Sequence, residues 1–141
     1  MEHCVFCNIV KDNSKASIVY ADEKALAFMD IQPVNPGHTL VVPRSHISRL
    51  SQLDENTGVH MFKVAMRVAE GLKHSCVRCE GVNLLLSDGE AAFQEIFHVH
   101  LHVIPRFQGD GFSIRFGRQY GSKPDKNELD KIAQCIREAM R

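Results

Sequence analysis

The sequence predicts one α+β domain, in which one long helix packs on an antiparallel sheet and a second helix closes the chain. Short apolar segments alternate with polar residues at a period of two and are bounded by turn formers, as is typical of strands. Residues 54–74 carry apolar residues at helical spacing, and residues 124–141 are amphipathic at the same spacing. A chain of 141 residues is long enough to bury one core of its own.

Four segments predict the strands. Residues 17–30, SIVYADEKALAFMD, contain two short strands on either side of the polar ADEK turn. Residues 38–43, HTLVVP, form a strand that ends at its proline, which lacks the N–H that a further ladder bond would need. Residues 81–87, GVNLLLS, indicate a buried strand, and residues 97–105, FHVHLHVIP, alternate histidines with apolar residues.

Two segments predict the helices. In residues 54–74 the apolar face is formed by side chains at helical spacing, namely Val59, Phe62, Met66, Ala69 and Leu72. In residues 124–141 one face carries Leu129, Ile132, Ile136 and Met140. The remaining segments, residues 88–97 and the glycine-rich residues 109–124, are expected to be mostly loops.

Charge and composition exclude several classes of function. Lys plus Arg and Asp plus Glu each number 17, so the formal net charge is zero, which disfavours a nucleic-acid polymer but not a single nucleotide. No apolar run approaches the ~20 residues of a membrane span. Residues 1–13 lack the basic start and apolar core of a signal peptide. We therefore expect a cytoplasmic protein that has no membrane partner.

The histidine segment carries the clearest functional signal. Because side chains on a strand alternate between its faces, His98, His100 and His102 are expected to share one face. Half-buried structural histidines are the simplest alternative, but a triple alternation is unlikely to arise by chance. A single straight strand separates its outer positions too far for three bonds to one zinc ion. The three histidines should therefore have different roles.

The five cysteines raise the question of a metal. Cys4 and Cys7 form one C-x-x-C pair, Cys76 and Cys79 form a second, and His74 lies near the second pair. Spacing alone allows a four-cysteine zinc site, a site that pairs Cys4 and Cys7 with histidines, or reduced thiols without metal.

Three segments together resemble the histidine triad (HIT) family of nucleotide hydrolases and transferases. HVHLHVI fits the pattern in which three histidines alternate with apolar residues, PVNPGHTLVVPRSHI resembles a second family signature, and GEAAFQEIFHVHLHVIPR followed by GDGF resembles bacterial members. The resemblance extends from CVFCNIV to about Gly111. It implies a HIT-like antiparallel sheet, a single HIT domain over residues 1–141, and a homodimer.

The resemblance also implies roles for the four histidines of the catalytic set. His100, the middle histidine, would attack the α-phosphorus and form a nucleotidyl-histidine intermediate. His102 would contact the phosphate and help the leaving group to depart, and His38 would support the triad. His98, the first triad histidine, would join Cys4, Cys7 and His46 as a ligand of a structural zinc ion.

Further residues are implied in nucleotide binding. Asp30 resembles the family's ribose contact, and Gln94 and Glu95 lie on the loop whose backbone or side chains contact the phosphate in relatives. Ser87 departs from the family, which usually has Asn or Gln eleven residues before His98. Because a serine side chain is shorter, we expect the contact with the leaving group to differ. Phe93 also replaces a residue that is commonly small.

The function implied is a hydrolase that cleaves at the α-phosphate of purine nucleotide conjugates, such as nucleoside phosphoramidates formed from AMP and an amine. One alternative is a dinucleoside polyphosphate (Ap4A-type) hydrolase, which would use the same nucleophile. A second alternative is a nucleotide-binding, zinc-stabilised interaction module with little turnover.

Overall fold

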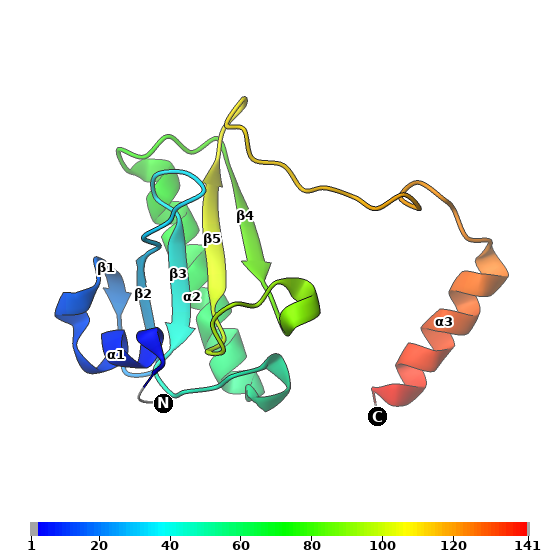
Figure 1. Cartoon of the computed structure of the whole chain (residues 1–141), viewed down its shortest axis with the longest axis horizontal. Helices are drawn as coiled ribbons and strands as arrows, with labels where there is room; N and C mark the ends of the chain where they lie inside the picture. Colours follow the sequence, from blue (N-terminus) through cyan, green and yellow to red (C-terminus); the bar gives the residue numbers. More distant parts are fainter. Residues whose placement is uncertain (1–2, 141) are drawn as a thin grey trace. The chain divides into compact units, whose positions relative to one another are not determined.

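The computed structural model describes residues 3–140 and divides the chain into two compact units, Met1–Gly111 and Phe112–Arg141. The first unit contains the sheet (Figure 1). Its five strands are β1 (Ile18–Ala21), β2 (Ala25–Met29), β3 (Thr39–Pro43), β4 (Gly81–Leu86) and β5 (Leu101–Arg106). Every neighbouring pair is antiparallel, in the order β1-β2-β3-β5-β4. The predicted α+β architecture is therefore confirmed.

One long helix, α2 (Glu55–His74), covers one face of the sheet (Figure 1). It begins after Asp54, whose side chain accepts a hydrogen bond from the backbone N–H of Thr57, so the cap satisfies a donor that has no partner within the helix. The core between α2 and the sheet consists of alternate strand residues and one stripe of the helix, with Ala25, Ala27, Val41, Leu101 and Val103 facing Met61, Val64, Ala65, Val68 and Leu72.

A short helix that the sequence analysis missed, α1 (Val5–Lys11), packs beside the opposite face of the sheet. Phe6 and Ile9 of α1 meet Leu26, Phe28 and other strand residues that alternate with those facing α2. Since strand side chains alternate between faces, His102 lies on the α1 side when Leu101 and Val103 face α2. His102, one of the predicted site residues, therefore lies on the α1 face.

The predicted buried face of α2 is only partly correct, because Leu72 is buried and Ala69 packs against the core while the other three residues are exposed. Val59, Phe62 and Met66 are 70%, 51% and 58% exposed, whereas Met61 and Val64 are almost completely buried. The helix has apolar residues on two sides, and helical spacing alone does not say which side meets the sheet.

Two strand predictions also need correction. The segment predicted as a buried strand is β4, which lies at the edge of the sheet, with Leu84 and Leu85 38% and 47% exposed. The histidine strand begins only at Leu101, so His98 and His100 precede it in irregular backbone. There the Val99 N–H donates to the carbonyl of Ile47 over 2.7 Å, which takes the place of a ladder bond.

The remaining elements are short 3-10 turns and the terminal helix. The turns are η1 (Asn13–Lys15), η2 (Leu50–Gln52) and η3 (Glu90–Ala92). In the second unit, α3 (Lys126–Ala139) is capped by Asp125, whose side chain accepts from the Glu128 N–H. The assignment of residues 1–141 to a single HIT domain stays a prediction. No helix within residues 3–140 is long and apolar enough to cross a membrane.

Candidate functional site

A cavity of about 640 Å³ opens on the α1 face of the sheet. His38, His100 and His102 line it together with apolar side chains that include Phe6, Ile9 and Phe28. Asp30, just after β2, and Glu95, in the loop before the triad, also contribute to the wall. The cavity therefore combines imidazoles, two carboxylates and an apolar lobe, which is a common composition for a small-molecule site.

Hydrogen bonds to main-chain carbonyls fix the proton positions on two of the histidines. His100 Nδ1 lies 2.8 Å from the carbonyl oxygen of His98, and His98 Nε2 lies 2.8 Å from the carbonyl oxygen of Pro43. A carbonyl only accepts, so each of these nitrogens carries the proton. In the neutral rings His100 Nε2 and His98 Nδ1 are therefore unprotonated, and each carries a lone pair.

A second chain of hydrogen bonds fixes His38 and His102. The Val34 N–H donates to His38 Nδ1 over 3.0 Å, so in the neutral ring the proton of His38 is on Nε2. His38 Nε2 lies 2.9 Å from His102 Nδ1 and donates to it. His102 must then carry its own proton on Nε2. The network thus prepares a lone pair on His100 and an N–H on His102.

Burial keeps these imidazoles neutral. Desolvation is the largest cause that lowers the pKa of His38, His98 and His100. For His102 desolvation, assisted by the neighbouring His100 and His38, lowers the pKa to about 4. The nearby carboxylate of Asp30 opposes this effect at His38, His100 and His102. Neutral rings are the form in which His100 has a nucleophilic nitrogen.

Asp30 is held at the edge of the cavity by its own loop. Its Oδ1 accepts from the Gln32 N–H over 2.8 Å, and its Oδ2 lies 3.6 Å from His38 Nε2. The second oxygen is therefore beside His38 rather than bound to the loop. Asp30, His38 and His102 could also be considered as three metal ligands. However, His38 Nδ1 already accepts a hydrogen bond from the Val34 N–H, and its Nε2 carries the proton and donates to His102, so its neutral ring has no lone pair left for a cation.

The loop before the triad is organised by Gln94 from behind. Gln94 is only 4% exposed and does not line the cavity. Its Oε1 accepts from the Gly89 N–H over 2.8 Å, and its Nε2 donates to the carbonyls of Ser48 and Ile96. Ser87 also lies outside the cavity lining, whereas Glu95 is part of it.

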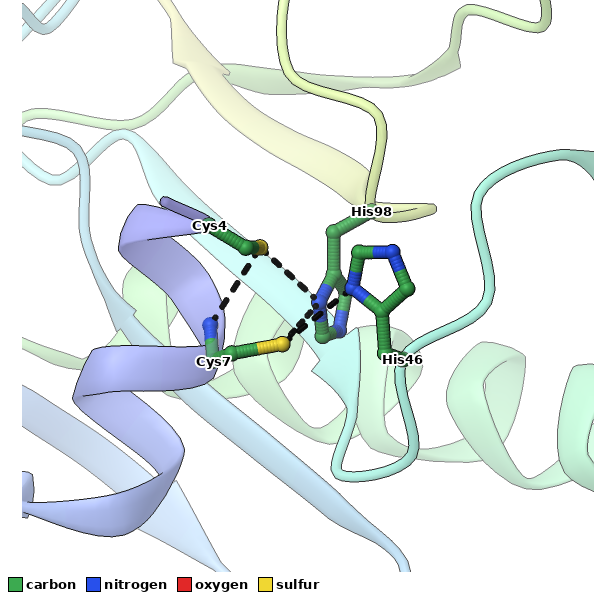
Figure 2. A group of neighbouring side chains, drawn as sticks. All are labelled: Cys4, Cys7, His46 and His98. Atoms are coloured by element: carbon green, nitrogen blue, oxygen red, sulfur yellow. Dashed lines mark hydrogen bonds between the residues drawn. The ribbon is translucent and has the colours of Figure 1, made fainter. Parts of the chain in front are cut away.

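A separate cluster joins two thiols and two imidazoles, all among the residues predicted as zinc ligands (Figure 2). Cys7 Sγ lies 3.2 Å from His46 Nδ1 and 3.5 Å from His98 Nδ1, and Cys4 Sγ also lies 3.5 Å from His98 Nδ1. Cys4 caps α1, which explains the spacing of the C-x-x-C pair: the two sulfurs lie on the same side of its first turn. His46 follows β3 and His98 precedes β5.

The donor geometry of this cluster fits tetrahedral zinc. With Zn–S near 2.3 Å and Zn–N near 2.0–2.1 Å, a tetrahedral ion places its sulfur and nitrogen ligands about 3.5 Å apart. The observed separations are 3.2–3.5 Å. His98 Nδ1 is unprotonated and can therefore bind a cation. His46 Nε2 lies 3.3 Å from Ser48 Oγ and can donate to it, which leaves the lone pair of His46 Nδ1 facing the Cys7 sulfur.

The second C-x-x-C pair is not part of this cluster. Cys76 is exposed, and the Cys79 thiol donates to the carbonyl of Gly81 over 3.3 Å.

Two parts of the site were not predicted from the sequence. The apolar wall supplied by α1 could have been found from the spacing of Phe6 and Ile9, whereas nothing in the sequence indicates that the Val34 N–H orients His38.

Comparisons with known proteins agree on one family. A model of the HIT domain matches residues 11–109. An uncharacterised HIT-like protein of Methanocaldococcus jannaschii is 41% identical over 135 residues, which cover 95% of this chain and 98% of that protein. The crystal structure of a HIT family protein from Bacillus anthracis matches this structure with a TM-score of 0.90, and the two sequences are 35% identical over 99% of both chains. A zinc-bound histidine triad family protein from Mycobacterium smegmatis has a TM-score of 0.76, 36% identity and 99% coverage of both chains.

Proposed function

Because the chain belongs to the HIT domain family, we propose that it is a hydrolase acting at the α-phosphate of purine nucleotide conjugates. The substrates would be nucleoside phosphoramidates, such as AMP joined to an amine. The observation that carries this proposal is the hydrogen bond from His100 Nδ1 to the His98 carbonyl. It leaves His100 Nε2 as a lone-pair donor on the wall of a cavity large enough for a nucleotide.

In the proposed first step, His100 Nε2 attacks the α-phosphorus and the phosphorus–nitrogen bond breaks, while the leaving nitrogen takes up one proton from solvent and departs as the neutral amine. In the second step water attacks the same phosphorus, the bond between phosphorus and His100 breaks to release the nucleoside monophosphate, and the proton lost from water returns to solvent. Two displacements at phosphorus, with the His100 nitrogen as the intermediate nucleophile, replace one difficult hydrolysis. The lowered pKa of His100 supports this role, because the ring stays neutral at neutral pH.

His102 would supply a hydrogen bond through its Nε2–H to the phosphate and the leaving nitrogen. The His38 donation to His102 Nδ1 supports this assignment, since it holds the proton of His102 on Nε2. A fixed donor aimed at developing negative charge lowers the barrier without reorganising during the reaction. His38 is thus proposed as a positioning residue that acts through His102.

The nucleoside would occupy the end of the cavity that Asp30 borders. The free carboxylate oxygen of Asp30 can accept hydrogen bonds from the ribose hydroxyls. The apolar side chains of Phe6, Ile9 and Phe28 form a wall against which a base can pack. Gln94 would shape the phosphate-binding loop from behind, and direct phosphate contacts by Glu95 and Ser87 stay predictions.

We further propose that Cys4, Cys7, His46 and His98 hold a structural zinc ion. The donor distances fit tetrahedral zinc, and the zinc-bound relative from M. smegmatis supports the choice of metal. Four protein ligands would close the coordination shell, so the ion would stabilise the start of the triad segment and take no part in the chemistry. A homodimer and a cytoplasmic location also stay predictions.

The decisive experiment is turnover of an AMP phosphoramidate, followed by alkaline quench and intact-mass measurement. Wild-type protein should show the added mass of one nucleotidyl group, and His100→Ala should show neither the adduct nor hydrolysis. His60→Ala is the matched control, because His60 contacts Asp22 outside the cavity. Hydrolysis that survives His100→Ala would refute the nucleophile. Tight nucleotide binding without turnover would favour the interaction module, and faster cleavage of dinucleoside polyphosphates would favour the Ap4A-type alternative.

A further inference from the structure

Phe93 has an unusual backbone conformation at the edge of the cavity. It follows η3 with φ 67° and ψ 30°, the left-handed region. Within residues 3–140 it is the only residue other than glycine with a positive φ, and five glycines occupy the other such positions. This region is disfavoured for a side chain with a Cβ, because the Cβ crowds a carbonyl oxygen. A phenylalanine held there suggests a use for its ring.

The surrounding loop fixes this conformation. The Phe93 N–H donates to the Glu90 carbonyl over 2.9 Å, and the Gln94 N–H donates to the Gly89 carbonyl over 3.1 Å. The buried side chain of Gln94 adds three more hydrogen bonds to the backbone on both sides of the loop. The direction in which the Phe93 side chain leaves the backbone is therefore determined by the loop.

The ring of Phe93 faces the cavity and is left uncovered. It lines the same cavity as His100 and His102, yet the residue is 87% exposed. An exposed aromatic face beside reactive groups is apolar area that a bound ligand can remove from water. Ile31 is the other strongly exposed apolar residue of the lining, at 94%, and it adjoins Asp30 at the proposed nucleoside end. Phe93 instead directly precedes Gln94 and Glu95 in the loop that is proposed to bind the phosphate, so we assign its ring to the group attached to phosphorus.

We propose that Phe93 determines leaving-group specificity by stacking on an aromatic group of the amine that is released. This inference rests on the proposed function and extends it to a substrate class, phosphoramidates of amines that carry an aromatic ring. A stacked or edge-on aromatic pair changes an equilibrium or rate constant by about three- to tenfold, in addition to the effect of the apolar area that it buries.

The test compares two conjugates of the same nucleoside monophosphate, one with an arylalkyl amine and one with a small aliphatic amine. The measured quantity is the ratio of kcat/KM for the aromatic conjugate to kcat/KM for the aliphatic one. In Phe93→Gly this ratio should fall about three- to tenfold, because glycine adopts a positive φ without strain while the ring is lost. Phe93→Tyr, which retains the ring, should keep the ratio near the wild-type value. Ile31→Ala should change kcat/KM for both conjugates by the same factor and leave the ratio unchanged.

Each other outcome would overturn the inference. An unchanged ratio in Phe93→Gly would exclude stacking on the leaving group, and a change in oligomeric state by sedimentation would then assign the ring to a protein interface. An equal loss for both conjugates, with a lowered unfolding temperature, would assign Phe93 to loop stability alone. If wild-type protein hydrolyses neither conjugate, the proposed function fails and the inference fails with it, whereas hydrolysis of both without a ratio change removes only the inference.

Discussion

The hydrogen-bond chain from Val34 through His38 to His102 makes a prediction about leaving groups. In His38→Phe an aromatic ring still fills the site, but both hydrogen bonds of His38 are lost. The Val34 N–H loses the acceptor that lies 3.0 Å away, and His102 Nδ1 loses the donor that lies 2.9 Å away. A polar group left unsatisfied at a fully buried position costs about 1–3 kcal/mol. Both of these bonds are only partly buried, so the free energy of unfolding should fall by no more than about 2–6 kcal/mol. His102 is then free to place its proton on Nδ1, and the Nε2–H that faces the leaving group is no longer enforced.

The activity assay compares an AMP conjugate of an alkyl amine with an AMP ester of 4-nitrophenol. Negative charge that develops on the amine nitrogen before it is protonated needs a hydrogen-bond donor, whereas nitrophenolate spreads its charge over the ring and leaves without a proton. Loss of an orienting partner typically costs about 10–100-fold, so we expect that loss for the amine and much less for the nitrophenol ester. His60→Phe is the matched control, since it removes the 2.6 Å contact with Asp22 outside the cavity and should leave the comparison unchanged. Equal losses for both substrates in His38→Phe would refute the orienting role.

Three further predictions test the fold, the metal cluster and the pH dependence. Met61→Ala should lower the free energy of unfolding by about 2–5 kcal/mol in urea titrations, whereas Phe62→Ala should lower it far less, because the side chain at 61 is buried and its neighbour is half exposed. In Cys7→Ser, metal analysis should find the zinc lost, and the unfolding temperature should fall. In Cys79→Ser the zinc should be retained. The reverse pattern would place the zinc site at the second C-x-x-C pair. Stability measured by thermal unfolding should decrease as pH falls from about 6.5 to about 4, because the unfolded chain takes up a proton in this range while His102 in the folded protein does not. A stability that rises over this range would contradict the neutral state of His102.

The sequence allowed the elements to be located but not all of their orientations. Period-two alternation identified the strands, and helical spacing identified α2, because both patterns follow from local geometry. The buried face of α2 could not be deduced, since apolar Val59 and Phe62 lie on one side and apolar Met61 and Val64 on another. Only packing against the sheet decides between two such stripes.

The cluster of Cys4, Cys7, His46 and His98 illustrates a second limit of prediction from the sequence. Its donors come from three separate parts of the chain, and the spacing of the cysteines is equally consistent with a four-cysteine site. Family resemblance named His46 and His98, and the structure brings their Nδ1 atoms to the sulfurs. The helix that places Cys4 and Cys7 is too short for a clear periodic signal, because α1 has only 7 residues.

The proposed division of roles among the three alternating histidines depends on how His98 is placed. Its ring is completely buried, points away from the cavity lining toward the two cysteines, and is held by the Pro43 carbonyl. The main-chain carbonyl of His98 accepts a hydrogen bond from His100 Nδ1–H. The backbone that His98 and its cysteine contacts hold in place therefore also sets the tautomer of His100. A strand with ladder bonds throughout would have committed this carbonyl to a neighbouring strand. The irregular backbone before Leu101 leaves it free, and the departure from the predicted strand is therefore what allows His100 to present Nε2 to the cavity.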